Sequence, residues 1–152
     1  MAEVFLGEDQ LLGRPVAVKV LFPEFASDPN FVERFRREAQ AAANLSHPNI
    51  VGVFDWGKES NTYYIVMEYV EGRTLSQIIR NEGPLPTARV AEIADAIASA
   101  VGFAHKGNVV HRDMKPGNVI ISDNGQIKVA DFGIATAISV SYTHLTLPTI
   151  FA

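Results

Sequence analysis

His111-Arg112-Asp113-Met114-Lys115-Pro116-Gly117-Asn118, followed thirteen residues later by Asp131-Phe132-Gly133, is the stretch that decides the fold of this chain. The first segment brings a carboxylate, a lysine and a carboxamide together in one short loop. Two strand-like runs, Val119–Ile121 and Gln126–Val129, lie between the two segments. Asp123-Asn124-Gly125 separates these runs and is a strong signal for a hairpin turn. The two polar segments therefore flank one predicted β-hairpin.

Four side chains in these segments carry the chemistry of phosphoryl transfer. Asp113 can accept a proton from a hydroxyl group or orient it, and Lys115 can place a positive charge beside a phosphate. Asn118 and Asp131 offer oxygen atoms, which are the ligands that Mg²⁺ prefers. Taken singly, either aspartate is more simply explained as a residue that forms a turn. Together, in this order and spacing, the four predict transfer of a phosphoryl group from a nucleotide to a hydroxyl.

Two further charged residues interrupt apolar patterns in the first part of the chain. Lys19 lies inside the apolar strand pattern 16–21, so it must either extend to solvent or find an anion. Glu38 lies on the apolar stripe of a predicted helix, which also holds Phe31, Phe35, Ala42 and Leu45. The simpler alternative for Glu38 is a partly exposed residue at the edge of that stripe. A Lys19–Glu38 ion pair would satisfy both residues and orient the lysine on the nucleotide phosphates.

The remaining pattern predicts an α+β fold in two lobes that join near residues 68–72. Strands are expected over residues 3–7, 16–21, 50–56, 62–67, 119–121 and 126–129. Helices are expected over 28–44, with Asp28 as N-cap and Pro29 at the first position, over 75–80, and after Pro84–Thr87. The apolar stripe of the last helix consists of Val90, Ile93, Ala94, Ile97, Val101 and Ala104. Gly107 is expected to end this helix as a left-handed cap.

Composition excludes several other classes of protein. A net charge of −4 and a pI of about 5.5 argue against a nucleic-acid binder that tracks phosphates. The chain has no cysteine, which excludes disulfides and fits a reducing compartment. The apolar runs are too short to span a bilayer, and no secretory leader is present. We therefore expect no nucleic-acid partner, no membrane segment in this chain, and a cytoplasmic location.

Over about residues 1–138 the chain resembles the eukaryotic-like (Hanks-type) Ser/Thr protein kinases, and the bacterial members most closely. The likeness extends to Phe35-Arg36-Arg37-Glu38-Ala39, His47-Pro48-Asn49-Ile50-Val51 and the stretch from Tyr64 to Gly72. It implies a two-lobed kinase fold. Residues 1–70 would be a partial N-lobe with an antiparallel sheet and the αC helix. Residues 71–138 would begin a mostly helical C-lobe and run through the Asp-Phe-Gly motif.

The resemblance also implies an adenine pocket. Met67 would be the gatekeeper, the backbone of Glu68 and Val70 would bind the adenine edge, and Val4, Ala17 and Ile120 would enclose the adenine faces. Phe132, His111 and Ala42 would belong to the spine that couples the lobes. Arg112 would grip a phosphorylated residue of the activation segment. By the same resemblance, Lys115 is the choice of a Ser/Thr-specific rather than a tyrosine-specific enzyme.

The expected function is transfer of the ATP γ-phosphoryl group to Ser or Thr hydroxyls of protein substrates, with Mg²⁺, or alternatively Mn²⁺, as the cation. A homodimer and a membrane anchor downstream are left open for a longer parent protein. A pseudokinase, binding nucleotide or acting as a scaffold, is one alternative. It predicts loss of at least one of the six residues Lys19, Glu38, Asp113, Lys115, Asn118 and Asp131, all of which are present. A second alternative is a gene-assembly artefact without a function of its own.

Three departures from the family pattern motivate that second alternative. The Gly-rich phosphate loop and first strand, expected before Glu3-Val4, are absent, as are an activation segment and its Ala-Pro-Glu anchor after residue 138. Val140–Thr149 looks like a translated sequencing-library adapter, since GTC TCT TAT ACA CAT CTG ACG CTG CCG ACG reads codon for codon as these ten residues. We interpret residues 139–152 as a non-native tail, with a divergent activation loop as the alternative. The chain as written is expected to be unstable and to transfer no phosphate.

The interpretation of the tail makes a prediction about the underlying DNA. Read coverage of the gene should fall abruptly at the codon for residue 139 or 140, because adapter sequence is not genomic. Uniform coverage through the codon for residue 152 would favour a divergent activation loop instead.

Overall fold

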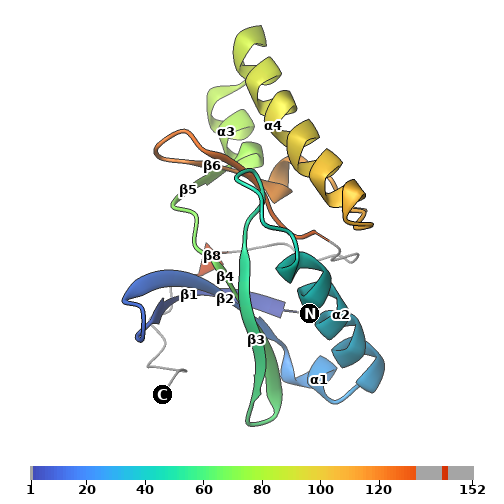
Figure 1. Ribbon diagram of the computed structural model, residues 1–152. Helices are drawn as coiled ribbons and strands as arrows, with labels where there is room; N and C mark the ends of the chain where they lie inside the picture. The colour runs from blue at the N-terminus through green and yellow to red at the C-terminus, as the bar shows by residue number, and fades with distance from the viewer. Residues whose placement is uncertain (1, 133–141, 144–152) are drawn as a thin grey trace. The chain divides into compact units, whose positions relative to one another are not determined.

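The computed structural model describes residues 2–132 and 142–143 (Figure 1). The chain forms two compact units. The first contains Met1–Ala43, Val53–Tyr69 and Ala137–Ala152, and the second contains Asn44–Gly52 and Val70–Thr136. The second unit thus includes Asn44–Gly52, which lies in the sequence between two parts of the first unit. The sequence pattern did not indicate this grouping.

The first unit is built on a mostly antiparallel sheet with strand order β3-β4-β2-β1-β8. Its strands are β1 (Ala2–Asp9), β2 (Arg14–Leu21), β3 (Val53–Glu59), β4 (Thr62–Glu68) and β8 (Tyr142–Thr143). The β1–β2 hairpin is longer than predicted, because pairing continues to Asp9 opposite Arg14. Gly13 permits the turn with a φ of 61°. The two residues of β8, within the expected tail, pair in parallel with β1.

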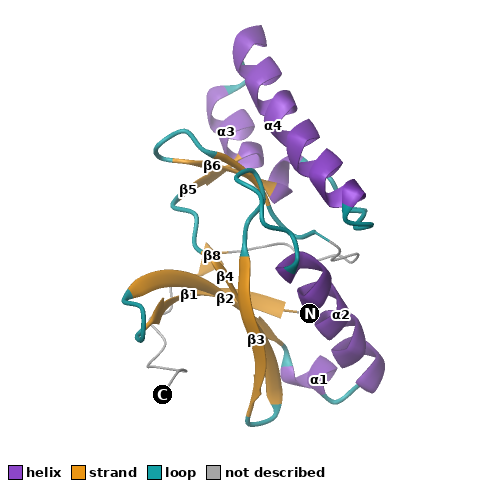
Figure 2. Ribbon diagram, viewed as in Figure 1, coloured by secondary structure: helices purple, strands orange, loops and turns teal. Residues whose placement is uncertain are grey.

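Two helices accompany this sheet, as Figure 2 shows in purple. The short α1 (Pro23–Ala26) was not predicted, whereas α2 (Pro29–Ala43) confirms the predicted helix. The Asp28 side chain accepts a hydrogen bond from the Asn30 amide, as expected of an N-cap. The face of α2 that packs on the sheet consists of Val32, Phe35 and Ala39, which meet Leu21 and Ile65 in one apolar cluster.

The predicted strand over residues 50–56 was placed too early. β3 begins at Val53, and Ile50 instead forms an isolated parallel bridge with Val129 in the second unit. The pairing of β3 with β4 also shifts register between Val53 and Asp55. The apolar run Ile50–Val53 could not reveal this division, because it reads as one continuous strand.

The second unit combines a small antiparallel sheet, in the order β5-β6-β7, with two helices. Its elements are β5 (Gly72–Thr74), α3 (Leu75–Glu82), α4 (Thr87–Lys106), the 3₁₀ turn η1 (Pro116–Asn118), β6 (Val119–Ser122) and β7 (Ile127–Val129). The predicted hairpin is confirmed, with Gly125 at a φ of 89° in its turn. Gly72 begins β5, and only glycine fits there, because a Cβ would lie 2.2 Å from the Ile121 carbonyl oxygen.

Two predictions for α4 were wrong in detail. The buried face is centred on Ile93, Ala100 and Ala104, while Val90 is 50% exposed. Gly107 has a φ of −88°, and the left-handed residue is Asn108, with a φ of 59°. The Asn108 amide donates to His105 O and the Val109 amide to Ala104 O, which together form a Schellman cap. Asparagine tolerates this conformation better than most residues other than glycine.

A capping box fixes the start of α3. The Thr74 side chain accepts from the Gln77 amide at 3.1 Å, and the Gln77 side chain accepts from the Thr74 amide at 2.9 Å. In a folded protein that contains residues 2–132, Thr74→Ala should therefore cost about 1 kcal/mol of unfolding free energy. Denaturant titration measures this loss, and Thr74→Ser, which keeps the hydroxyl, should retain most of the stability. Equal stability of the two variants would contradict the cap.

Candidate active site

A buried histidine holds the loop that carries Asp113. His111 is 2% exposed, and its Nδ1 accepts a hydrogen bond from the Asp113 amide at 3.1 Å. Its Nε2 therefore carries the proton in the neutral ring and donates to the Ala130 carbonyl oxygen at 2.7 Å. The ring also meets Phe132 edge to face, with centroids 4.7 Å apart. The sequence predicted a packed histidine here, but not that it would bridge the Asp113 loop to the strand before Asp131.

Asn118 ties the other end of the loop to the same aspartate. It is buried, and its Nδ2 donates to the Asp113 backbone oxygen at 2.8 Å, with a longer contact of 3.5 Å to Asp113 Oδ2. Its backbone oxygen accepts from the Ala130 amide at 2.8 Å. Both side-chain contacts use the amide nitrogen, which leaves the carbonyl oxygen Oδ1 to serve as a metal ligand.

Lys115 lies beside the Asp113 carboxylate. Lys115 Nζ is 3.2 Å from Asp113 Oδ2, and the two side chains are 45% and 39% exposed. An ion pair this exposed contributes little to stability, typically about 0–1 kcal/mol. Its value is chemical, because it places a cation next to the carboxylate that would face a hydroxyl group. The structure thus brings Asp113, Lys115 and Asn118 together as the sequence predicted.

Two residues of the site have left-handed backbone conformations. Arg112 has a φ of 72° and Asp131 a φ of 62°. For residues other than glycine such conformations cost about 1–3 kcal/mol each and persist only where the surroundings hold them. Their position next to Asp113 and at the predicted metal ligand is the pattern expected of a functional site. No feature of the sequence signalled the strain itself.

Asn118 and Asp131 fit a magnesium site. Mg²⁺ is usually bound by one or two carboxylates together with water and substrate phosphates rather than by a cage of protein ligands. The described residues contain no group of three or more histidines and acids placed to hold a metal. An amide oxygen and one carboxylate are therefore a suitable protein contribution for a cation delivered with a nucleotide.

In the first unit, Lys19 is 1% exposed on β2, which excludes extension of its ammonium to solvent. Glu38 is half-buried on α2, between the buried Phe35 and Ala39. Burial of a charge this deep requires compensation by an anion or by hydrogen bonds. The specific pairing of Lys19 with Glu38 stays a prediction.

The strand register places four predicted nucleotide-binding residues on one face of the first sheet. Val4 pairs with Lys19, and Ala17 pairs with Leu6 on one side and Met67 on the other. Because side chains alternate along a strand, Val4, Ala17, Lys19 and Met67 share a face.

The structure also locates the other three residues that are predicted to contact adenine. Glu68 ends β4 opposite Val16. Ile120, on β6, is buried, and Val70 is half-buried; both belong to the second unit. The joint adenine pocket remains a prediction from the family resemblance.

Comparisons with known proteins show which family the chain resembles. The sequence profile described as "Protein kinase domain" matches residues 1–149. The chain is 52% identical over 145 residues to the serine/threonine-protein kinase PrkC of Bacillus subtilis, covering 95% of this chain and 22% of that protein. It is 49% identical over 145 residues to PknB of Mycobacterium leprae, covering 93% and 23%. The profile match overlaps the adapter-like segment, whose origin stays a prediction.

Solved structures show the same likeness. The chain superposes on the Mycobacterium tuberculosis PknI kinase domain with a TM-score of 0.79 and 39% identity, covering 90% of this chain and 56% of that domain. The chain belongs to the protein kinase family. It spans about a fifth to a quarter of the length of the curated relatives named here. Within its described residues, no helix has both the length and the apolar character needed to cross a membrane.

The histidine bridge makes a kinetic prediction for a complete kinase domain that contains residues 2–132. His111→Phe keeps an aromatic ring against Phe132 but removes the hydrogen bonds to Asp113 and Ala130. At about 1 kcal/mol for each bond, kcat should fall at least about tenfold while KM for ATP stays nearly constant. Steady-state assays measure both parameters. His105→Phe, an exposed position on the last turn of α4, is the matched control and should leave kcat unchanged.

Proposed function

We propose that the protein containing this chain transfers the γ-phosphoryl group of ATP to Ser and Thr hydroxyls of protein substrates. The observation that carries the proposal is the network around Asp113, in which His111 and Asn118 fix the loop and Lys115 lies 3.2 Å from the carboxylate. The relatives named serine/threonine-protein kinases support the choice of acceptor.

In this proposal Asp113 orients the acceptor hydroxyl and takes its proton as the phosphoryl group leaves the nucleotide. Lys115 offsets the negative charge that builds up on the transferring group. Asn118 Oδ1 and the Asp131 carboxylate would hold Mg²⁺, or Mn²⁺ in its place, and the cation would supply positive charge to the nucleotide phosphates. Lys19, oriented by Glu38, binds the α and β phosphates.

The proposal also includes the adenine contacts that the family resemblance implies. Met67, Val4 and Ala17 lie on one face of the first sheet. By the family resemblance, Ile120 would also contact the adenine. The backbone of Glu68 and Val70 would supply the hydrogen bonds to the adenine edge. We place the kinase domain in the cytoplasm, where ATP is abundant, and leave a homodimer and a membrane anchor of the longer protein as predictions.

A pseudokinase that only binds nucleotide is the second candidate. Such a protein would be expected to lack at least one of the six residues assigned to catalysis and binding, and all six are present. The two functions differ in one measurable respect: the pseudokinase binds ATP without turnover.

Asp113→Asn tests the proposed function in a complete kinase domain that contains residues 2–132. Asparagine keeps the shape of the side chain but cannot accept the proton, so phosphate transfer to a generic basic protein should fall about 10²–10⁴-fold. ATP binding, followed by calorimetry, should persist. The matched control is Asp123→Asn in the exposed β6–β7 turn, which should retain full transfer. Undiminished transfer by Asp113→Asn would refute the assignment.

A further inference from the structure

The segment that follows α2 pairs with the outer edge of β7 through an isolated parallel bridge. One edge of β7 is occupied by β6, with Ile120 opposite Lys128. On the other edge, the Val129 amide donates to Asn49 O at 2.8 Å, and the Val51 amide donates to Val129 O at 2.9 Å. This is a parallel pairing around Ile50, and it ends two residues before Asp131.

Asn49 extends this pairing with its side chain. In a regular parallel ladder the Asn49 backbone amide would donate to the Ile127 carbonyl oxygen. Here that amide donates to His47 Nδ1 at 3.0 Å. The Asn49 side-chain Nδ2 takes its place and donates to Ile127 O at 2.9 Å, across 78 positions of sequence. To make this bond, the side chain at position 49 needs a hydrogen-bond donor at the same distance from the backbone as the asparagine Nδ2.

His47 is held in turn by α4. Because its Nδ1 accepts from Asn49, its Nε2 carries the proton in the neutral ring and donates to Ser99 Oγ at 3.1 Å. The His47 ring also packs on Phe103, with centroids 5.1 Å apart. The segment is thus attached to the longest helix of the unit as well as to β7.

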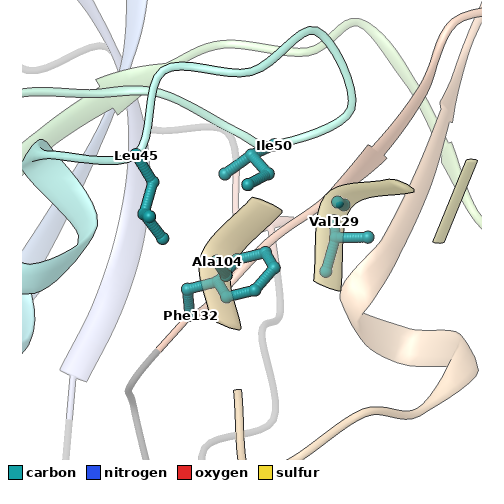
Figure 3. Close-up of a cluster of buried hydrophobic side chains, with 6 residues drawn as sticks. Leu45, Ile50, Ala104, Val129 and Phe132 are labelled. Carbon is teal, nitrogen blue, oxygen red and sulfur yellow. The ribbon is translucent and has the colours of Figure 1, made fainter. Parts of the chain in front are cut away.

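The same segment fixes the residues on both sides of Asp131. Ile50 and Leu45 share one buried cluster with Val129 and Phe132, as Figure 3 shows. Val129 is two residues before Asp131, and Phe132 directly follows it. The left-handed backbone of Asp131 has to be held by its neighbours, since it is unfavourable by itself.

From these contacts we propose that Asn49 is a positioning residue for Asp131: its side-chain hydrogen bond to β7 keeps the Asp131 carboxylate in place for the cation. The inference rests on the proposed function only in the assignment of Asp131 as a magnesium ligand. Asn49 itself lies outside the catalytic and nucleotide-binding residues.

The experiment compares Asn49→Ala and Asn49→Asp in a complete kinase domain that contains residues 2–132. Asp keeps the size of the side chain but has no donor. In metal-free protein, hydrogen exchange of the Val129 and Ala130 amides should speed up about three- to tenfold in both variants, the ratio expected for one lost hydrogen bond. The Mg²⁺ concentration for half-maximal activity should rise by a similar factor, with KM for the protein substrate unchanged.

Asn81→Ala, an exposed position on α3, is the matched control and should change neither measurement. Wild-type exchange and wild-type Mg²⁺ dependence in both Asn49 variants would overturn the inference. So would faster exchange without a change in Mg²⁺ dependence, because β7 would then loosen without affecting Asp131. If the wild-type protein transfers no phosphate, the proposed function fails, whereas the exchange measurement and titration of Mn²⁺ binding still test Asn49.

Discussion

The hydrogen bonds of the His111 ring are the constraint on which the candidate site depends. One nitrogen accepts from the Asp113 amide and the other donates to the Ala130 carbonyl oxygen. A single buried ring therefore fixes the loop of the proposed base relative to the strand that leads to the proposed metal ligand. Loss of either bond would leave a buried polar group without its partner, which costs more than the bond itself contributes.

Near this ring, backbone hydrogen bonds are made along both edges of β7. The Ala130 amide reaches the Asn118 carbonyl, and Val129 is paired with the segment near Asn49. The strand is only three residues long, so pairing on one edge would hold it weakly. Pairing on two edges, together with the apolar cluster that contains Val129 and Phe132, gives this short strand the rigidity that the proposed metal site would need.

Much of the fold could be predicted because its signals are local. Asp28-Pro29 begins a helix through capping and a fixed φ, and Asn124-Gly125 makes a hairpin turn through a positive φ. The errors had two sources. Ile50 lies outside the predicted strand because it pairs with Val129 instead, which is a tertiary contact. At the end of α4 the error is local, since Asn108 rather than Gly107 has the left-handed conformation of the cap.

The sequence by itself determined the proposed chemistry, since the types and spacing of Asp113, Lys115, Asn118 and Asp131 define which atoms would be offered to a nucleotide and its cation. Only the tertiary structure decided how these atoms are held. Hydrogen bonds such as Asn49 to Ile127 join positions 78 residues apart, and a strained backbone such as that of Asp131 depends on packing. No local pattern of residues encodes either of them, because both exist only once distant parts of the chain meet.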